Sequence, residues 1–396
     1  MKKRICTVLI MLLCMGLCAC AGLQTAALPE QTDAAEPSAE AAQQPTQTPA
    51  PTPNAEEVRA QTVERVLAGL TIEEKVGQML FVRSDAENNA EMIQTLGVGG
   101  LVLFGADFEN KTMADVITAN DEYQQESKIP LLIATDEEGG RVVRASKNAL
   151  LIEKPFASPQ ELYAQGGLAA VQEDTRQKAD FLLSLGVNVN LAPVCDVAAS
   201  PTSFIYPRTL GEDAQQTGEY VACVVSAAAE AGLGSVLKHF PGYGDAGDTH
   251  TDIMIDTRPL ETFQTGDLLP FAAGIEAGAG AVLVAHNIVN AFDSTQPASL
   301  SPAVCRYLRD EMGFAGVIMT DDLAMDGVAD FVGERNAAVL AVQAGSSMII
   351  TSAPAVDAGE ILAAVESGTI GEQTIDDAVR YVLGWKYDLG LLDDEL

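Results

Sequence analysis

The 396-residue chain is poor in basic residues, in histidine and in cysteines that could pair. It has 23 lysines and arginines against 56 aspartates and glutamates, which gives a formal net charge of −33. Such an excess of negative charge argues against nucleic acid as a partner and against a polybasic patch that binds anionic membrane surfaces. Attachment to a membrane should therefore depend on lipid rather than on surface charge.

The cysteines do not have the spacing of a disulfide framework or of a metal site. Four of the seven lie within the first 20 residues, and Cys195, Cys223 and Cys305 are far apart in the remaining chain. No CxxC pair and no zinc-knuckle spacing occurs. We expect three ordinary semi-buried thiols, and we expect neither a metal ion nor a cofactor.

The N-terminus contains no apolar run long enough for a confident transmembrane helix. Residues 2–4 are basic and precede a short apolar stretch over residues 5–16, as in a signal peptide. The sequence LCAC at residues 17–20 resembles a bacterial lipobox. We expect cleavage of residues 1–19, lipid attachment to Cys20 and an extracytoplasmic protein anchored to the membrane. An ordinary secretory signal is the alternative.

Residues 20–56 form a low-complexity segment rich in Ala, Pro, Gln, Thr and Glu. Its apolar surface is too small to offset the entropy of ordering it. We therefore predict a disordered tether that holds the folded part, residues 57–396, away from the membrane.

From residue 57 onward, short apolar runs alternate with longer amphipathic stretches. This pattern is typical of repeated βα units around a parallel sheet. Eight such units predict a (β/α)8 TIM barrel, with a doubly wound open sheet as the alternative. The predicted strands are 78–82, 100–104, 131–134, 187–191, 235–237, 281–285, 317–319 and 348–350, and the clearest helices are 113–126, 171–185, 215–231 and 334–344.

Polar residues follow five of the eight predicted strands. A TIM barrel carries its chemistry at the carboxyl ends of its strands, so these residues should meet at one rim. They are Asp136 and Glu137 after the third strand, Asp196 after the fourth, Lys238 and His239 after the fifth, His286 after the sixth, and Asp321 and Asp322 after the seventh.

The densest polar stretch is KHFPGYGDAGDTHTD, residues 238–252. Its glycines and proline predict a long non-helical loop on the catalytic face. Asp248 and His250 are two residues apart, close enough for a carboxylate–imidazole hydrogen bond that raises the basicity of the imidazole. Such a pair can act as a general acid and base.

Two other stretches place carboxylates at predicted strand ends. A buried strand that ends in Asp321 and Asp322 is costly unless function or partners hold these residues. Asp321 could attack the anomeric carbon of a sugar, whereas Asp322 could cap a helix. In DEEGGRVVR, residues 136–144, the glycine pair allows close approach of a ligand, and Asp136 could accept hydrogen bonds from sugar hydroxyls.

Together these stretches resemble glycoside hydrolase family 3, in its β-N-acetylglucosaminidase branch, over about residues 60–390. KHFPG and TDDLAM are the most specific matches, and LTIEEKVGQM at 70–79, YPRTLG at 206–211 and KYDLGL at 386–391 agree with them. The resemblance implies a single catalytic barrel without the additional C-terminal domain of some relatives. One departure is Tyr243, where the family usually has histidine.

The resemblance also implies a reaction and the residues that perform it. Asp321 matches the nucleophile, and Asp248 with His250 matches the acid/base pair. These roles imply a retaining exo-β-N-acetylglucosaminidase that removes terminal β-linked N-acetylglucosamine from cell-wall or chitin-type oligosaccharides by double displacement. The residues implied to bind the sugar are Asp136, Arg144, Arg208, Lys238 and His239.

Several alternatives remain at this stage. A β-glucosidase or an N-acetylglucosamine phosphorylase of the same family is possible, since a histidine repels an incoming phosphate less than a carboxylate would. A metal-dependent amidohydrolase is disfavoured because Arg83-Ser84, not an HxH pair, follows the first strand. A non-catalytic glycan-binding lipoprotein is disfavoured because Asp321 and His250 are both present. The natural aglycone stays open, and we expect a monomer.

Overall fold

The computed structural model describes residues 54–393 except 199, 245–252 and 334. The predicted signal peptide, Cys20 and most of the tether therefore lie outside the described residues, as do Asp248 and His250. The first helix, α1 (Ala55–Ala68), begins two residues before the predicted start of the folded domain. The Asn54 side chain caps it by accepting a hydrogen bond from the Glu57 amide at 2.9 Å.

Eight parallel strands form one sheet in the order β10-β1-β2-β3-β4-β5-β7-β9. A parallel bridge between Met319 and Met348 connects the two ends of this order, so the sheet is a nearly closed barrel. The predicted TIM barrel is thus confirmed. The strands are β1 (Leu80–Arg83), β2 (Gly100–Leu103), β3 (Leu132–Thr135), β4 (Val189–Asn190), β5 (Gly234–Phe240), β7 (Ala281–Val284), β9 (Val317–Thr320) and β10 (Ile349–Thr351).

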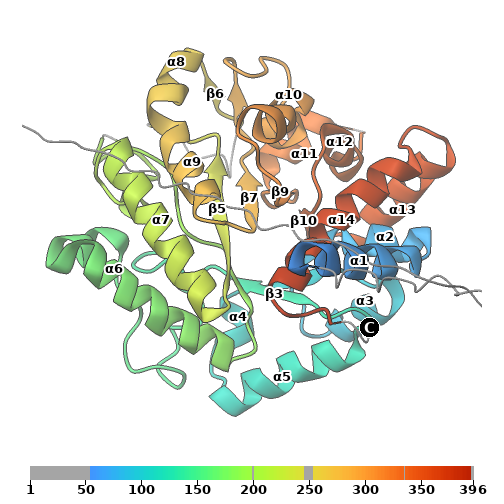
Figure 1. The fold of residues 1–396 in the computed structure, drawn as a ribbon, viewed down its shortest axis with the longest axis horizontal. Coiled ribbons are helices and arrows are strands. Elements are labelled where there is room, and N and C mark those ends of the chain that lie inside the picture. Colours follow the sequence, from blue (N-terminus) through green and yellow to red (C-terminus); the bar gives the residue numbers. More distant parts are fainter. Residues whose placement is uncertain (1–53, 199, 245–252, 334, 394–396) are drawn as a thin grey trace, which may run out of the picture. The chain divides into compact units, whose positions relative to one another are not determined.

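Helices surround these strands (Figure 1). Several begin with a capping box, a reciprocal pair of hydrogen bonds at the start of a helix. In α5, the Thr112 side chain accepts a hydrogen bond from the Asp115 amide, and the Asp115 side chain accepts one from the Thr112 amide. The helices after α1 are α2 (Ile72–Gln78), α3 (Asn89–Leu96), α4 (Gly105–Phe108), α5 (Met113–Glu126), α6 (Pro159–Ser184), α7 (Ala214–Ala231), α8 (Leu260–Thr262), α9 (Leu268–Glu276), α10 (Pro302–Arg306), α11 (Asp326–Val332), α12 (Ala337–Ala344), α13 (Pro354–Glu366) and α14 (Glu372–Asp388).

Most predicted strand boundaries differ from the observed ones by one to three residues, and two of these differences bear on particular side chains. Gln78 ends helix α2 instead of starting β1, because its buried side chain donates a hydrogen bond to the Gly97 carbonyl at 2.8 Å. Strand β5 continues to Phe240, which pairs with Val284, so Lys238 and His239 lie within the strand rather than after it.

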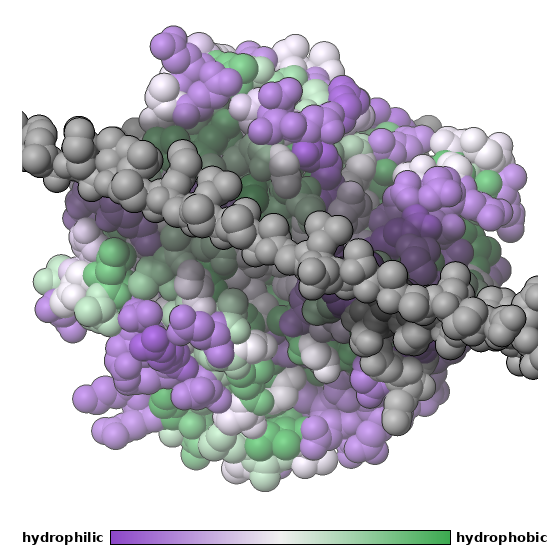
Figure 2. Space-filling view, in the orientation of Figure 1, coloured by the Kyte–Doolittle hydropathy of each residue, from purple (hydrophilic) through white to green (hydrophobic). Residues whose placement is uncertain are grey.

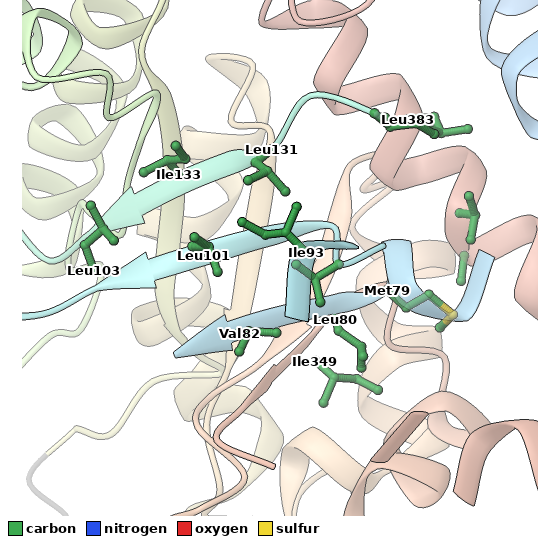
Figure 3. Packing of buried hydrophobic residues seen from close by; sticks show 14 of the residues in the cluster. Met79, Leu80, Val82, Ile93, Leu101, Leu103, Leu131, Ile133, Ile349 and Leu383 are labelled. Carbon is green, nitrogen blue, oxygen red and sulfur yellow. The ribbon is translucent and has the colours of Figure 1, made fainter. Parts of the chain in front are cut away.

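The side chains of the barrel strands alternate between two apolar layers. Leu101 of β2 faces outward and belongs to the cluster that contains Ile93 of α3 and Leu383 of α14 (Figure 3). Its neighbour Val102 faces the barrel interior, where it shares a cluster with Phe81 of β1. This period of two follows from the pleat and explains why the strands are apolar almost throughout.

Helix α14 closes the barrel at the amino ends of the strands. Trp385, the only tryptophan of the chain, is 4% exposed and belongs to the interior cluster. A Cβ atom on Gly280, which immediately precedes β7, would lie 2.0 Å from the indole Nε1 of Trp385. Glycine at position 280 therefore leaves the room that lets the indole enter.

The outer surface of the barrel is mixed in character. On the face shown in Figure 2, hydrophilic residues are widespread, and hydrophobic residues form separate patches between them. Within the part of the chain that the structure describes, no helix has the length and apolar character needed to cross a membrane.

Lys386 provides a test of how this end of the barrel is stabilised. It is fully buried, its Nζ donates a hydrogen bond to Gln78 Oε1 at 2.7 Å, and burial lowers its pKa from 10.5 to about 7. Between these two pH values the unfolded chain binds a proton that the native chain lacks, so the native state gains stability as the pH rises. One pKa unit corresponds to about 1.4 kcal/mol.

We therefore expect the Lys386→Met variant to gain stability over the wild type most clearly near pH 7, and to lose this advantage as the pH approaches 10. The measurement is the melting temperature of both proteins across this range. Gln78 Oε1 loses its donor in the variant at every pH, so the pH dependence of the difference is the informative quantity. A difference that does not change with pH would contradict the prediction.

Candidate active site

An open pocket of about 710 Å³ lies at the carboxyl ends of the barrel strands. Its volume is in the range of small-molecule sites. Asp321 directly follows β9, Asp136 directly follows β3, and Lys238 lies near the end of β5, so the parallel sheet brings the three together. The pocket is lined by six of the residues predicted to act on or bind the sugar: Asp136, Arg144, Arg208, Lys238, His239 and Asp321.

Two cations and two carboxylates form the charged wall of the pocket. The Nζ of Lys238 lies 2.7 Å from Asp136 Oδ1 and 2.6 Å from Glu138 Oε1. Arg208 donates to both oxygens of Glu138, at 2.9 and 2.7 Å. Burial alone would raise the pKa of Glu138, but the charges of Lys238 and Arg208 outweigh it and hold that pKa well below its usual range.

Glu138 was not predicted as a site residue, although it belongs to the DEEGG stretch. It is buried and contacts both cations, so it fixes their positions rather than competing with a ligand at the mouth of the pocket. Nearby carboxylates also raise the pKa of Lys238, against the effect of burial. Lys238 and Arg208 therefore stay charged at neutral pH and can donate hydrogen bonds to the oxygens of a sugar.

His239 is held between Asp196 and Arg208. Its Nδ1 lies 2.8 Å from Asp196 Oδ2, and its Nε2 lies 3.1 Å from Arg208 Nη2. A guanidinium only donates, so Nε2 accepts and Nδ1–H donates to the carboxylate, which defines the tautomer. Asp196 was noted at the sequence level only as a strand-end residue.

Tyr243, the departure from the family pattern, lies beside His239. The two rings are 5.1 Å apart between centroids, and the Tyr243 amide donates to Asp196 Oδ1 at 2.8 Å. The Tyr243 side chain is buried. The aromatic ring therefore packs against His239, and Tyr243 also lines the pocket.

Glu137 anchors the loop that carries Arg144. Its carboxylate accepts hydrogen bonds from the amides of Arg144 at 3.0 Å and Ala145 at 2.9 Å, and from the Ser146 hydroxyl. Burial raises the pKa of Glu137. Arg144 is thereby placed with its Nη2 at 3.6 Å from Asp136 Oδ2, on the same side of the pocket.

Asp321 lies at the end of β9 with a defined backbone environment. Its amide donates to the Val284 carbonyl at 3.0 Å, and its Oδ1 accepts from the Asp322 amide at 2.8 Å. The pKa of Asp321 is lowered although burial acts in the opposite direction, and the Asp322 amide and the charge of Lys238 are among the groups that lower it. The carboxylate is thus ionised at neutral pH, as a nucleophile must be.

His286 is buried directly beside this aspartate and does not line the pocket. Its Nε2 lies 3.0 Å from the Asp322 carbonyl, so this nitrogen carries the proton, and its Nδ1 lies 2.7 Å from the Ser299 hydroxyl. Burial lowers the pKa of His286. The neutral imidazole therefore fixes the peptide that follows Asp321.

Asp322 does not cap a helix, which corrects the role considered for it. Helix α11 begins only at Asp326, and Asp322 Oδ1 instead accepts a hydrogen bond from the Ala324 amide at 2.9 Å in the turn before it. Its Oδ2 lies 3.8 Å from Arg83 Nη1. Arg83 also lines the pocket, as does Arg141, and neither was predicted.

Within residues 54–393, leaving out the gaps given above, no cluster of three or more His, Cys, Asp and Glu side chains could hold a metal ion. The absence of a metal from the reaction stays a prediction. Cys195, Cys223 and Cys305 are free thiols, as the sequence predicts, and burial raises the pKa of each of them.

A barrel whose charged pocket opens beside an ionised strand-end aspartate has the architecture of the barrel glycoside hydrolases. Residues 71–384 match the model of the glycosyl hydrolase family 3 N-terminal domain, and the chain belongs to this family. The family expected from the sequence is thus confirmed.

Similar proteins agree with this assignment. The chain is 33% identical over 300 residues to a beta-hexosaminidase of Xanthomonas euvesicatoria pv. vesicatoria (strain 85-10), an alignment that covers 74% of this chain and 88% of that protein. Similar solved structures include a family 3 beta-N-acetylglucosaminidase from Paenibacillus sp. str. FPU-7, with a TM-score of 0.76, 31% identity and coverage of 81% of this chain and 63% of that one. Another is a beta-N-acetylhexosaminidase from Beutenbergia cavernae DSM 12333, with a TM-score of 0.71, 28% identity and coverage of 79% and 98%.

Proposed function

We propose that the protein is a retaining exo-β-N-acetylglucosaminidase that removes terminal β-linked N-acetylglucosamine from cell-wall or chitin-type oligosaccharides. The observation that carries this proposal is the ionised Asp321 in a pocket that Lys238, Arg208 and Asp136 also line. The names of the relatives support the choice of sugar.

In the first step, Asp321 attacks the anomeric carbon and forms a glycosyl-enzyme ester. Lys238, Arg208 and His239 lie where they can hold the sugar, and the carboxylate of Asp136 can accept hydrogen bonds from its hydroxyls. His250, which we propose as the general acid, protonates the leaving oxygen, and Asp248 favours its charged form. The roles of Asp248 and His250 rest on their spacing and on the family resemblance.

In the second step, water hydrolyses the glycosyl-enzyme ester. Neutral His250 takes a proton from this water, and the sugar leaves with retained configuration at the anomeric carbon. Because the acid/base is an imidazole, the usual relation between carboxyl separation and stereochemical outcome does not apply.

The direct test compares 4-nitrophenyl β-N-acetylglucosaminide with the corresponding β-glucoside, each with and without inorganic phosphate. We expect the N-acetylated substrate to be preferred and the product to be free N-acetylglucosamine in both conditions. Faster turnover of the glucoside would point to a β-glucosidase. A sugar 1-phosphate as the main product would point to a phosphorylase.

We also propose that Cys20 anchors the enzyme to the membrane outside the cytoplasm, which the LCAC sequence and the tether support. We expect Cys20→Ser to abolish lipid attachment and either release the protein or block its processing. The measurements are incorporation of labelled palmitate and fractionation of the cells.

Cys18→Ser is the matched control, since it changes a neighbouring cysteine but keeps a small residue at that position of the lipobox. Labelling should persist in this variant. Unchanged palmitate labelling and membrane attachment in Cys20→Ser would show that the anchor lies elsewhere.

A further inference from the structure

Outside the pocket, Arg258 lies between two buried aspartates. Its Nε and Nη2 donate to Asp256 Oδ2 at 2.9 and 2.7 Å, and its Nη1 donates to Asp267 Oδ2 at 2.9 Å. Both carboxylate side chains are only 5% exposed. Since all three guanidinium nitrogens donate to protein acceptors, this cluster serves the fold of the chain and not a ligand.

The chain that leaves strand β5 lies directly on this cluster. Gly242 has a φ of +112°, and a Cβ atom there would lie 2.7 Å from Asp267 Oδ1. Gly244 has a φ of +54°, and a Cβ atom there would lie 2.5 Å from Arg258 Nη1. Arg258 Nη2 also reaches the Gly242 carbonyl at 3.4 Å. The two glycines therefore allow the backbone to contact Arg258 and Asp267 directly.

The chain returns to the same cluster after residue 252. Asp256 lies in the short strand β6 (Ile255–Asp256), which pairs in parallel with β8 (Ile288–Val289) after β7. The Asn290 amide donates to the Asp256 carbonyl at 2.9 Å. Arg258 is thus bonded to Gly242 before residues 245–252 and to Asp256 after them.

Asp267 is the third anchor, supplied by the helical turn Phe263–Asp267. The Arg258 guanidinium also stacks over the Phe263 ring, with Cζ 4.4 Å from the ring centroid. Burial raises the pKa of Asp267 to about 6 in spite of the Arg258 charge. Since this value is still below 7, the carboxylate is mainly ionised at neutral pH and pairs with Arg258. The three anchors come from three separate segments of the chain, and Arg258 contacts all of them.

We propose that Arg258 is a positioning residue for the acid/base step, because it joins the two ends of the segment that carries Asp248 and His250. This inference rests on the proposed function of that pair. A general acid must lie within hydrogen-bond distance of the leaving oxygen, and a misplacement of 1 Å can cost about 10²-fold in rate. No hydrogen bond or ion pair among the described residues connects Arg258 to Asp321, so the nucleophile should be unaffected.

The experiment compares Arg258→Ala with the wild type on two substrates that differ in their leaving groups. 4-Nitrophenol leaves with little protonation, whereas the second sugar of N,N′-diacetylchitobiose needs a proton. We expect kcat/KM for the disaccharide to fall about 10²-fold and kcat/KM for the nitrophenyl glycoside to fall less than about tenfold. The kcat for the nitrophenyl glycoside should fall more than its kcat/KM, because His250 also activates the water of the second step. Azide, which needs no such activation, should partly restore this kcat.

Two kinds of variant keep this test informative. Arg59→Ala is the matched control, because Arg59 forms a similar bidentate ion pair with Asp388, at 2.7 and 2.8 Å, near the opposite end of the barrel. It should show no leaving-group effect. If Arg258→Ala folds poorly, Arg258→Lys and Asp267→Asn are the alternatives, because each removes only part of the contacts around the guanidinium. Both should give a smaller loss of kcat/KM that is again selective for the disaccharide.

His250→Ala, measured in parallel, tests the proposed acid/base function separately from the positioning role of Arg258. One outcome is that His250→Ala lowers kcat/KM selectively for the disaccharide, while every Arg258 and Asp267 variant lowers kcat/KM equally for both substrates. The inference about Arg258 is then overturned, and the proposed function stands. If His250→Ala itself lowers kcat/KM equally for both substrates, the proposed acid/base pair is wrong, and the inference about Arg258 is wrong as well.

Discussion

Asp321→Asn should reduce turnover by more than about 10³-fold, a loss similar in size to those seen when one member of a set of cooperating catalytic residues is removed. Asparagine keeps the shape of the side chain and can still accept the hydrogen bond from the Asp322 amide. It cannot form the glycosyl ester, because a neutral amide oxygen is a poor nucleophile. The substrate should still bind, since Lys238, Arg208 and Asp136 are unchanged. The measurements are kcat for the nitrophenyl glycoside and the dissociation constant of the intact substrate.

Asp322→Asn is the matched control for this variant. Asp322 is the adjacent carboxylate, it also lines the pocket, and its contacts are the Ala324 amide and, at 3.8 Å, Arg83. We expect a much smaller loss of kcat in this control. Retention of more than a few per cent of activity in Asp321→Asn would assign the nucleophile to another residue.

His250→Ala should have the second largest effect, and its size should depend on the leaving group. The proposed acid is protonated in the first step and neutral in the second, and the ordinary pKa of histidine is about 6.5. The wild type should therefore show a bell-shaped pH profile whose basic limb reports loss of the His250 proton. The acidic limb should lie low, since the pKa of Asp321 is lowered and the carboxylate stays ionised well below neutrality.

In the variant, the basic limb should disappear and the acidic limb should persist. We expect a loss of about 10² to 10⁴ for N,N′-diacetylchitobiose, the typical contribution of general acid catalysis, and a far smaller loss in kcat/KM for the nitrophenyl glycoside. The measurement is kcat/KM for both substrates across the pH range. An unchanged pH profile with equal losses on both would leave His250 with a structural role only.

The barrel could be predicted because its strands are buried on both faces. Runs such as Gly100–Leu103 and Ala281–Val284 are apolar without interruption, which distinguishes them from the amphipathic helices between them. The boundaries depended on contacts that no local pattern shows. Gln78 remains in a helix because of the Gly97 carbonyl, which lies 19 residues further along the chain.

The same distinction applies to the site. Asp321 and Asp136 were found because a strand-end carboxylate is conspicuous in an apolar run. Glu138 and Asp196 were missed as site residues because their importance lies in ion pairs and hydrogen bonds with residues 43 to 100 positions away, Lys238 and His239 among them. Only the closed sheet brings such partners together.

The way in which Trp385 closes the barrel gives the protein a built-in optical reporter. The chain has a single indole, and it is buried at the end of the barrel opposite the pocket. Its fluorescence should be blue-shifted while α14 is docked and should move to longer wavelength when the helix separates from the sheet. Substitutions at the pocket do not touch this fluorophore, so one emission spectrum distinguishes a variant that has lost its chemistry from one that has lost its fold.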